Sequence, residues 1–278
     1  MNSPTTGYLY IATGDKYIQE AIVSATSLKK LNDRAQISLV TDEKLNHPLF
    51  DEIITPPVKI ENFQQGLLYK VRHIYEASPY DRTLFIDTDT YFCEDCQDIF
   101  ETLDFFDLAL VPAPSDLNKA KSPKTQQILK ACVPYNTGVI LFKKSLNNDF
   151  LFKRWLEIFE AKVVNNSLRE TWETDQTSFI EAWLEAQSKV YVLSYAWNAR
   201  TPLFLNFSEP VKIIHGRHDD YERIEKELNK PRKNTPAANH RCWLPVENRC
   251  ITLEEVRQKN FKLGSTEAFQ SSNKTDFS

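Results

Sequence analysis

Short apolar runs alternate with amphipathic helical segments along this chain, and this alternation constrains the fold more than any other feature. Residues 8–13 form an apolar, aromatic run that predicts a buried strand, and the segment after it carries apolar residues on one helical face. Similar patterns predict strands at 36–41, 52–55, 83–86, 108–112, 139–142, 189–193 and 211–214, and helices at 67–76, 150–164 and 175–186. Strands that alternate with helices favour an α/β fold with a single, mostly parallel sheet sandwiched by helices. Ligands of such sheets bind outside the carboxyl ends of the strands.

The composition excludes several classes of protein. The chain has 278 residues, 41% of them hydrophobic, which is enough for a large core and excludes a disordered chain. The net charge is -4 and basic residues do not cluster, so we expect no nucleic-acid partner. No apolar stretch approaches the length of about 18 residues that a membrane helix needs, so we expect no membrane span and a cytoplasmic location. The five cysteines have no regular spacing, which indicates reduced thiols.

Glycine is scarce in this chain, and its spacing limits how the protein could bind a nucleotide. The six glycines stand at positions 7, 14, 66, 138, 216 and 264. The two common phosphate-binding loops, GxGxxG and GxxxxGK[ST], need glycines that lie closer together. If the chain binds a nucleotide, other groups must neutralise the phosphates.

Two carboxylates, Asp87 and Asp89, directly follow the apolar strand predicted at 83–86. They should therefore emerge at the ligand edge of the sheet, where they could hold a hard divalent cation. The alternative is a pair of solvated loop acids or a helix cap. His215 ends the strand predicted at 211–214 and is a candidate third ligand, although a lone histidine is more often structural. Two carboxylates and one imidazole leave positions open for phosphate oxygens, and we expect Mn²⁺, with Mg²⁺ as second choice.

Five segments, in order along the chain, resemble the nucleotide-sugar glycosyltransferases of the glycogenin and galactinol synthase type, which have the GT-A fold. They are residues 8–31, 85–90 (FIDTDT), 135–139 (YNTGV), 175–176 (DQ) and 213–216 (IIHG). The resemblance implies a metal-dependent enzyme that moves a sugar from a nucleotide-sugar donor to an acceptor hydroxyl. It favours a UDP-sugar as donor and leaves the acceptor open among glycans, lipids and proteins.

The resemblance also implies roles for individual residues. The donor would be bound by Ala12, Thr13, Tyr17, Lys70, Asp87, Thr88, Gly216 and Arg217, and the metal by Asp87, Asp89 and His215. Asn136, Asp175 and Gln176 would form the catalytic, acceptor-side group, with Asp175 beside the anomeric carbon and transfer with retention of configuration. After its histidine the family continues with a glycine and Lys-Pro-Trp, whereas this chain continues with GRHDD. Arg217 is therefore the candidate substitute for the lysine that contacts the diphosphate.

Two other functions stay open at this point. One is a magnesium phosphatase of the haloacid dehalogenase type, in which Asp87, Asp89, Asp219 and Asp220 would supply the nucleophile and the metal ligands. Three predicted strands before Asp87 argue against it, because that fold usually places its Asp-x-Asp motif on the first strand. The other is a nucleotide-sugar binding protein without turnover.

Several smaller features and the domain limits also have open interpretations. Residues 197–200 (WNAR) could line the site or form a structural loop, and Asp15 could contact a nucleotide or cap a helix. Cys93 and Cys96 have zinc-ligand spacing but lack a second close pair. We expect a GT-A catalytic domain over residues 1–230 and a C-terminal extension packed on it over 231–263. Residues 264–278 are rich in Ser, Thr, Asn and Asp, which predicts a disordered tail.

Overall fold

The computed structural model describes residues 3–58, 60–113, 134–164, 175–230 and 240–252, together with Gln127 and Glu255. Its central sheet has seven strands in the order β3-β2-β1-β4-β7-β6-β8. Their bounds are Thr6–Ala12 (β1), Ile37–Thr41 (β2), Glu52–Ile54 (β3), Arg82–Ile86 (β4), Leu108–Pro112 (β6), Tyr135–Lys143 (β7) and Val190–Val192 (β8). Neighbouring strands are parallel, except that β7 runs antiparallel to both β4 and β6. The predicted α/β fold with a mostly parallel sheet is confirmed.

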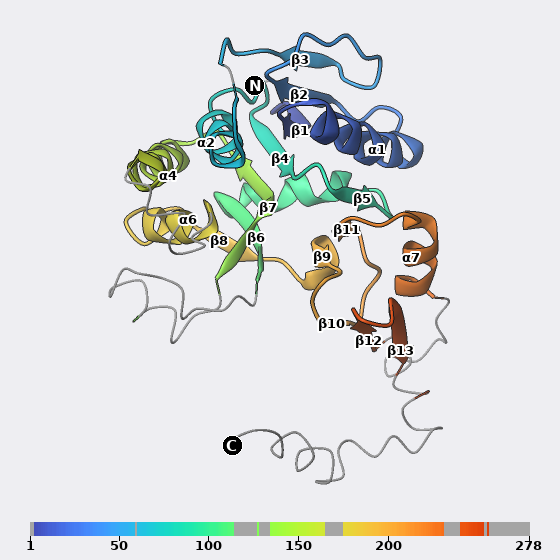
Figure 1. Cartoon of the computed structure of the whole chain (residues 1–278). Coiled ribbons are helices and arrows are strands. Elements are labelled where there is room, and N and C mark those ends of the chain that lie inside the picture. Colours follow the sequence, from blue (N-terminus) through green and yellow to red (C-terminus); the bar gives the residue numbers. More distant parts are fainter. Residues whose placement is uncertain are drawn as a thin grey trace, which may run out of the picture.

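Helices cover both faces of this sheet (Figure 1). One face packs against α1 (Asp15–Leu31) and the 3-10 helix η1 (Gln97–Asp104), and the other against α2 (Phe63–His73), α4 (Leu146–Val164) and α6 (Asp175–Trp183). Side chains of β1 alternate between the two cores, since Tyr8 and Tyr10 lie in the first and Leu9 and Ile11 in the second. Burial on both faces favours apolar residues at successive positions, which explains the continuous apolar sequence of β1.

A three-stranded sheet that the sequence did not predict brings distant segments to the end of β4. It consists of β5 (Thr90–Phe92), β9 (Ala199–Arg200) and β11 (Ile213–His215), in the order β5-β11-β9. The strand expected near 211–214 therefore belongs to this small sheet and not to the central one. Strand β11 is antiparallel to β5, with His215 opposite Thr90. This pairing places the end of β11 beside the residues that connect β4 to β5.

A second three-stranded sheet, also unpredicted, lies further along the chain (Figure 1). Its strands are β10 (Leu205–Phe207), β12 (Arg241–Leu244) and β13 (Arg249–Thr252). Together with the short helix η3 (Tyr195–Trp197) and helix α7 (Tyr221–Leu228), they enclose a third core around the fully buried Trp243. The tail expected at residues 264–278 lies outside the described residues.

The N-cap residues of α2, α1 and α7 show why these helices begin where they do. Asn62 accepts a hydrogen bond from the backbone N–H of Gln65, so α2 begins earlier than predicted. Helix α1 is capped by Gly14, which has a φ of 74°, and Asp15 is its first residue instead of its cap. Asp220 caps α7 by accepting from the N–H of Arg223. Across the described ranges, no helix has both the length and the apolar character that crossing a membrane requires.

Candidate metal and donor site

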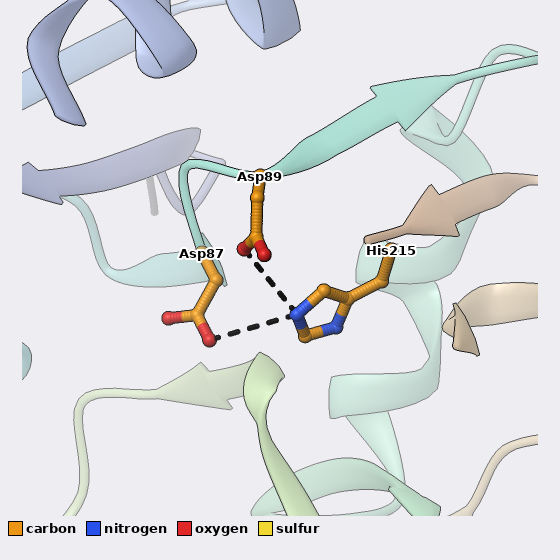
Figure 2. A group of neighbouring side chains, drawn as sticks. All are labelled: Asp87, Asp89 and His215. Carbon is orange, nitrogen blue, oxygen red and sulfur yellow. Dashed lines mark ion pairs between the residues drawn. The ribbon is translucent and has the colours of Figure 1, made fainter. Parts of the chain in front are cut away.

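Asp87 and Asp89 occupy the short connection between β4 and β5 (Figure 2). Strand β4 ends at Ile86, and the backbone N–H of Asp87 donates to the carbonyl of Gly138 on the neighbouring β7 at 2.7 Å. The hydroxyl of Thr90 donates back to the carbonyl of Asp87 at 2.9 Å. These bonds fix the backbone of the connection, so the two carboxylates are held in place by the sheet edge.

His215 faces these two carboxylates from the end of β11 (Figure 2). Its Nε2 atom lies 3.4 Å from Asp89 Oδ1 and 3.9 Å from Asp87 Oδ2. The backbone N–H of Gly216 donates to the carbonyl of Asp89 at 2.9 Å, which joins the two segments next to the cluster. Strand pairing thus brings together three side chains from two parts of the chain that are far apart in sequence.

The donor set of this cluster fits a divalent cation. Ligand atoms that share one cation at bond lengths of about 2.1 Å are at most about 4.2 Å apart, and both distances from His215 Nε2 satisfy this limit. Two carboxylates with one imidazole suit Mn²⁺ or Mg²⁺ and leave coordination positions free. In the described part of the chain, no other group of three or more His, Cys, Asp or Glu side chains could hold a metal ion. Cys93 and Cys96 have zinc-ligand spacing, but in the described part of the chain they do not belong to a group of three or more metal-binding side chains.

Charges around the cluster keep Asp89 ionised. Burial alone would raise the pKa of Asp89, but the hydrogen bond and the charge that a protonated His215 supplies, together with the charge of Arg217, outweigh burial and lower that pKa to about 2. An ionised carboxylate is the form that binds a cation. Asp89 is thus in the metal-binding form at any pH near neutrality.

Gly138 allows the cluster to be this compact. A Cβ atom at this position would lie 2.4 Å from Cε1 of His215, 2.6 Å from Oδ2 of Asp87 and 2.9 Å from Oδ1 of Asn136. All three distances are shorter than van der Waals contact, which is about 3.5–4.0 Å between carbon atoms. Only glycine fits at this point of β7 without displacing a candidate ligand.

Lys70 connects the cluster to the acceptor-side residues predicted from the sequence. Its Nζ atom lies 2.9 Å from Asp87 Oδ1 and 3.0 Å from Asp175 Oδ2. Burial would lower the pKa of Lys70, but the charges of Asp175 and Asp87 raise it above its usual value, so the amine is charged. This lysine, 9% exposed on α2, supplies a fixed positive charge between two carboxylates.

Asp175 and Gln176 begin helix α6, where other buried groups fix them. Thr137 donates from its hydroxyl to Asp175 Oδ2 at 2.9 Å, and the indole N–H of Trp155 donates to the Asp175 carbonyl at 2.9 Å. Asn136 donates from Nδ2 to Gln176 Oε1 at 3.2 Å. The three residues predicted as the acceptor-side group therefore lie close together and reach the metal cluster through Lys70.

Arg217 reaches the cluster from the other side, held by a residue that the sequence analysis missed. Glu20 on α1 accepts from Arg217 Nε at 2.7 Å and from Nη2 at 3.0 Å, and Asp89 Oδ2 lies 3.0 Å from Nη1. Glu20 also accepts from the Thr88 hydroxyl at 3.0 Å. The Arg217 side chain is 52% exposed, which leaves it accessible to a ligand. Glu20 carries no motif signal, because its partner is remote in sequence.

A pocket of about 470 Å³ opens beside the cluster. Eight predicted residues line it, namely Thr13, Tyr17, Lys70, Asp87, Thr88, Asp89, His215 and Arg217. The other residues predicted for the site do not line the pocket; they are Ala12, Asn136, Asp175, Gln176 and Gly216. Ala12 is packed in the core, and Gly216 has a φ of 136° but lies against Thr201. Residues that were not predicted complete the lining: Ile11, Lys16, Ile60, Asn62, Phe63, Gly66 and Leu67.

The segment 197–200, which the sequence left open between site and loop, lies next to the cluster, because Asn198 contacts His215 and Arg200 interacts electrostatically with Asp87 and Asp89. Asn198 is 1% exposed and contacts both His215 and Asn136. Ala199 and Trp197 pack instead with apolar side chains. The signal that singled out this segment was a polar cluster after the strand predicted at 189–193.

Solved structures that resemble this chain include glycosyltransferases. GlyE of Streptococcus pneumoniae aligns over 97% of this chain and 65% of its own, with 16% identity and a TM-score of 0.50. The bifunctional glycosyltransferase WbbM aligns over 79% of this chain and 47% of its own, with 15% identity and a TM-score of 0.50. Mouse xyloside xylosyltransferase 1 aligns over 76% of this chain and 97% of its own, with 16% identity and a TM-score of 0.48. No protein-family model and no curated protein sequence matches the chain. The architecture shared with GlyE and WbbM confirms the GT-A fold predicted from the sequence.

Proposed function

We propose that this protein is a metal-dependent glycosyltransferase that moves a sugar from a nucleotide-sugar donor to an acceptor hydroxyl. The observation that carries the proposal is the convergence of Asp87, Asp89 and His215 at the edge of a 470 Å³ pocket. A pocket of this size is suited to a small-molecule ligand such as a nucleotide sugar. A UDP-sugar is the favoured donor because of the resemblance to the glycogenin and galactinol synthase type.

Lys70 and Arg217 are placed to stabilise the negative charge that develops on the leaving group. A sugar that leaves a nucleoside diphosphate places negative charge on the departing phosphate. A divalent cation held by Asp87, Asp89 and His215, with Mn²⁺ favoured over Mg²⁺, would supply Lewis-acid stabilisation of that charge. Lys70 and Arg217 both line the pocket, where their positive charges would stabilise the departing phosphate.

The acceptor side is assigned to Asn136, Asp175 and Gln176. Asp175 shares Lys70 with Asp87, so a carboxylate lies next to the amine that faces the leaving group. We propose that Asp175 lies beside the anomeric carbon and that transfer retains its configuration. The acceptor is a glycan, a lipid or a protein.

The structure bears on the alternatives and on the domain limits. Asp87 follows β4, the fourth strand along the chain, and Asp220 is occupied as the cap of α7, which disfavours the phosphatase interpretation. The thermal-shift experiment described below distinguishes an enzyme from a nucleotide-sugar binding protein without turnover.

We also propose that the catalytic unit spans residues 1–230 and that the extension 231–263 packs on it, because β12 pairs with β10.

A thermal-shift panel of nucleotide sugars, with and without Mn²⁺, tests the proposal. A ligand at 100 times its Kd stabilises the native state by about 2.7 kcal/mol, and we expect one nucleotide sugar to raise the Tm only when Mn²⁺ is present. Asp89→Asn should abolish this shift, whereas Asp98→Asn, at an exposed acid in η1, should preserve it. Release of nucleoside diphosphate from the stabilising donor identifies an enzyme, and a shift without release identifies a binding protein. A panel without any Mn²⁺-dependent shift would refute the proposal.

A further inference from the structure

The amide of Asn198 forms a bridge between His215 and Asn136. Asn198 Nδ2 donates to Asn136 Oδ1 at 2.7 Å, and Asn198 Oδ1 lies 2.8 Å from His215 Nδ1. We propose that Asn198 is a positioning residue of the metal site, which holds the His215 ring in the tautomer whose Nε2 lone pair faces Asp87 and Asp89. This inference rests on the proposed function, because it takes His215 as a metal ligand.

The backbone of β7 fixes the direction of every hydrogen bond in this bridge. The N–H of Gly138, which can only donate, lies 2.9 Å from the Asn136 side chain, so the accepting atom is Oδ1. The Asn198 atom that faces the same Oδ1 must therefore be the amide nitrogen. The Asn198 oxygen then faces the His215 ring, and since an amide oxygen can only accept, His215 Nδ1 carries the hydrogen.

A hydrogen on Nδ1 leaves Nε2 of the neutral ring with its lone pair. Nε2 is the atom that points toward Asp89 Oδ1 and Asp87 Oδ2, at 3.4 Å and 3.9 Å. Metal-bound histidines usually donate their second ring N–H to a nearby acceptor, which fixes the tautomer and the ring orientation. Asn198 is in the position of that acceptor.

Packing limits the freedom of this arrangement. Asn198 and Asn136 are 1% and 4% exposed, so water cannot easily replace a lost hydrogen bond. The place where a Cβ of residue 138 would stand is only 2.4 Å from Cε1 of His215, so the ring lies tightly against β7. Asn136 also donates to Gln176 at 3.2 Å, which extends the bridge from the metal cluster to the acceptor-side group. One buried amide thereby couples the orientation of a metal ligand to the start of helix α6.

Mn²⁺ binding without any donor tests this role. Free Mn²⁺ is counted by electron paramagnetic resonance during titration of the metal-free protein. Asn198→Ala should weaken Mn²⁺ binding at least about tenfold, as is typical for loss of a group that orients a metal ligand. Asn198→Asp keeps an acceptor toward Nδ1 but sets a second oxygen against Asn136 Oδ1, so its Mn²⁺ affinity should fall between those of Asn198→Ala and the wild type. The matched control is Asn148→Ala, at a fully buried asparagine that donates to two backbone carbonyls in another part of the fold and should lose stability but not metal affinity.

The tautomer itself gives a second readout that requires no metal. Long-range proton–nitrogen spectra of ¹⁵N-histidine-labelled protein, assigned with His215→Ala, report which ring nitrogen carries the hydrogen. In the neutral ring of the wild type we expect protonated Nδ1, and in Asn198→Ala a mixture of both tautomers.

The outcomes separate this inference from the proposed function. A neutral ring protonated at Nε2, or Mn²⁺ affinity in Asn198→Ala within about threefold of the wild type, would overturn the role of Asn198 alone. A wild-type protein that binds no Mn²⁺ would overturn the metal site and with it the proposed function.

Discussion

Replacing Gly138 by alanine should disable the metal site, because the added methyl group meets two candidate ligands at once. Its Cβ would lie 2.4 Å from His215 Cε1 and 2.6 Å from Asp87 Oδ2. Carbon atoms in contact are about 3.5–4.0 Å apart, so the ring or the strand must move by about 1 Å. Metal–ligand distances tolerate only about 0.2 Å. We therefore expect at least one ligand to be lost.

The expected magnitude is a loss of Mn²⁺ affinity of at least about 100-fold, which corresponds to about 2.8 kcal/mol. Overpacking should also lower the free energy of unfolding by about 1–3 kcal/mol. Gly7→Ala is a matched control, since its Cβ would lie 2.3 Å from the Tyr80 ring, and Tyr80 is not part of the metal cluster. Both variants should be less stable in urea, but only Gly138→Ala should lose Mn²⁺ binding in a paramagnetic resonance titration. A Gly138→Ala protein with Mn²⁺ affinity within about threefold of the wild type would refute this reasoning.

Three further substitutions test the charges around the cluster. Lys70→Met leaves Asp87 and the buried Asp175 without their shared cation and should lower the free energy of unfolding in urea by about 3 kcal/mol; a loss below about 1 kcal/mol would contradict the role of this ion pair. Arg217→Ala should raise the KM for the donor about tenfold. It should change the stability little, because the Arg217 side chain is half exposed. Glu20→Gln should raise the KM less, and an unchanged KM in Arg217→Ala would exclude a diphosphate contact. Asp175→Asn should lower kcat by at least about 100-fold, and NMR of the wild-type product should show retained configuration; a near-normal rate or an inverted product would count against Asp175.

The core of the fold was predictable because it is encoded in long apolar runs. The strands β1, β2, β4, β6 and β7 lie where these runs predicted them, since burial on both faces favours apolar residues in such strands. Of the strands in the small sheet around β11, only β11 itself was predicted, at 211–214, and it was expected in the central sheet. The strands β5 and β9 have three and two residues, which is too short for any periodicity to be measured.

The sequence singled out the three residues of the metal cluster but not the contacts that surround them. Asp87, Asp89 and His215 were singled out by their positions after apolar strands, and the pairing of β11 with β5 brings them together. Sequence patterns are local, whereas the partners of Arg217 and His215 depend on which segments pack side by side. Glu20 was missed for this reason, and Asn198 was noticed only as part of a polar cluster. Helix α7 did carry a usable signal, since Asp220 precedes a segment with apolar residues four positions apart.

Metal-dependent turnover of a nucleotide sugar is the most direct test of the proposed function. The measurement is the release of nucleoside diphosphate by metal-free protein during Mn²⁺ titration, with Asp89→Asn and the exposed-site control Asp98→Asn in parallel. We expect release that requires Mn²⁺, stops on chelation, is absent in Asp89→Asn and persists in Asp98→Asn. Full turnover in excess chelator, or equal turnover by Asp89→Asn and the wild type, would contradict a metal site formed by Asp87, Asp89 and His215.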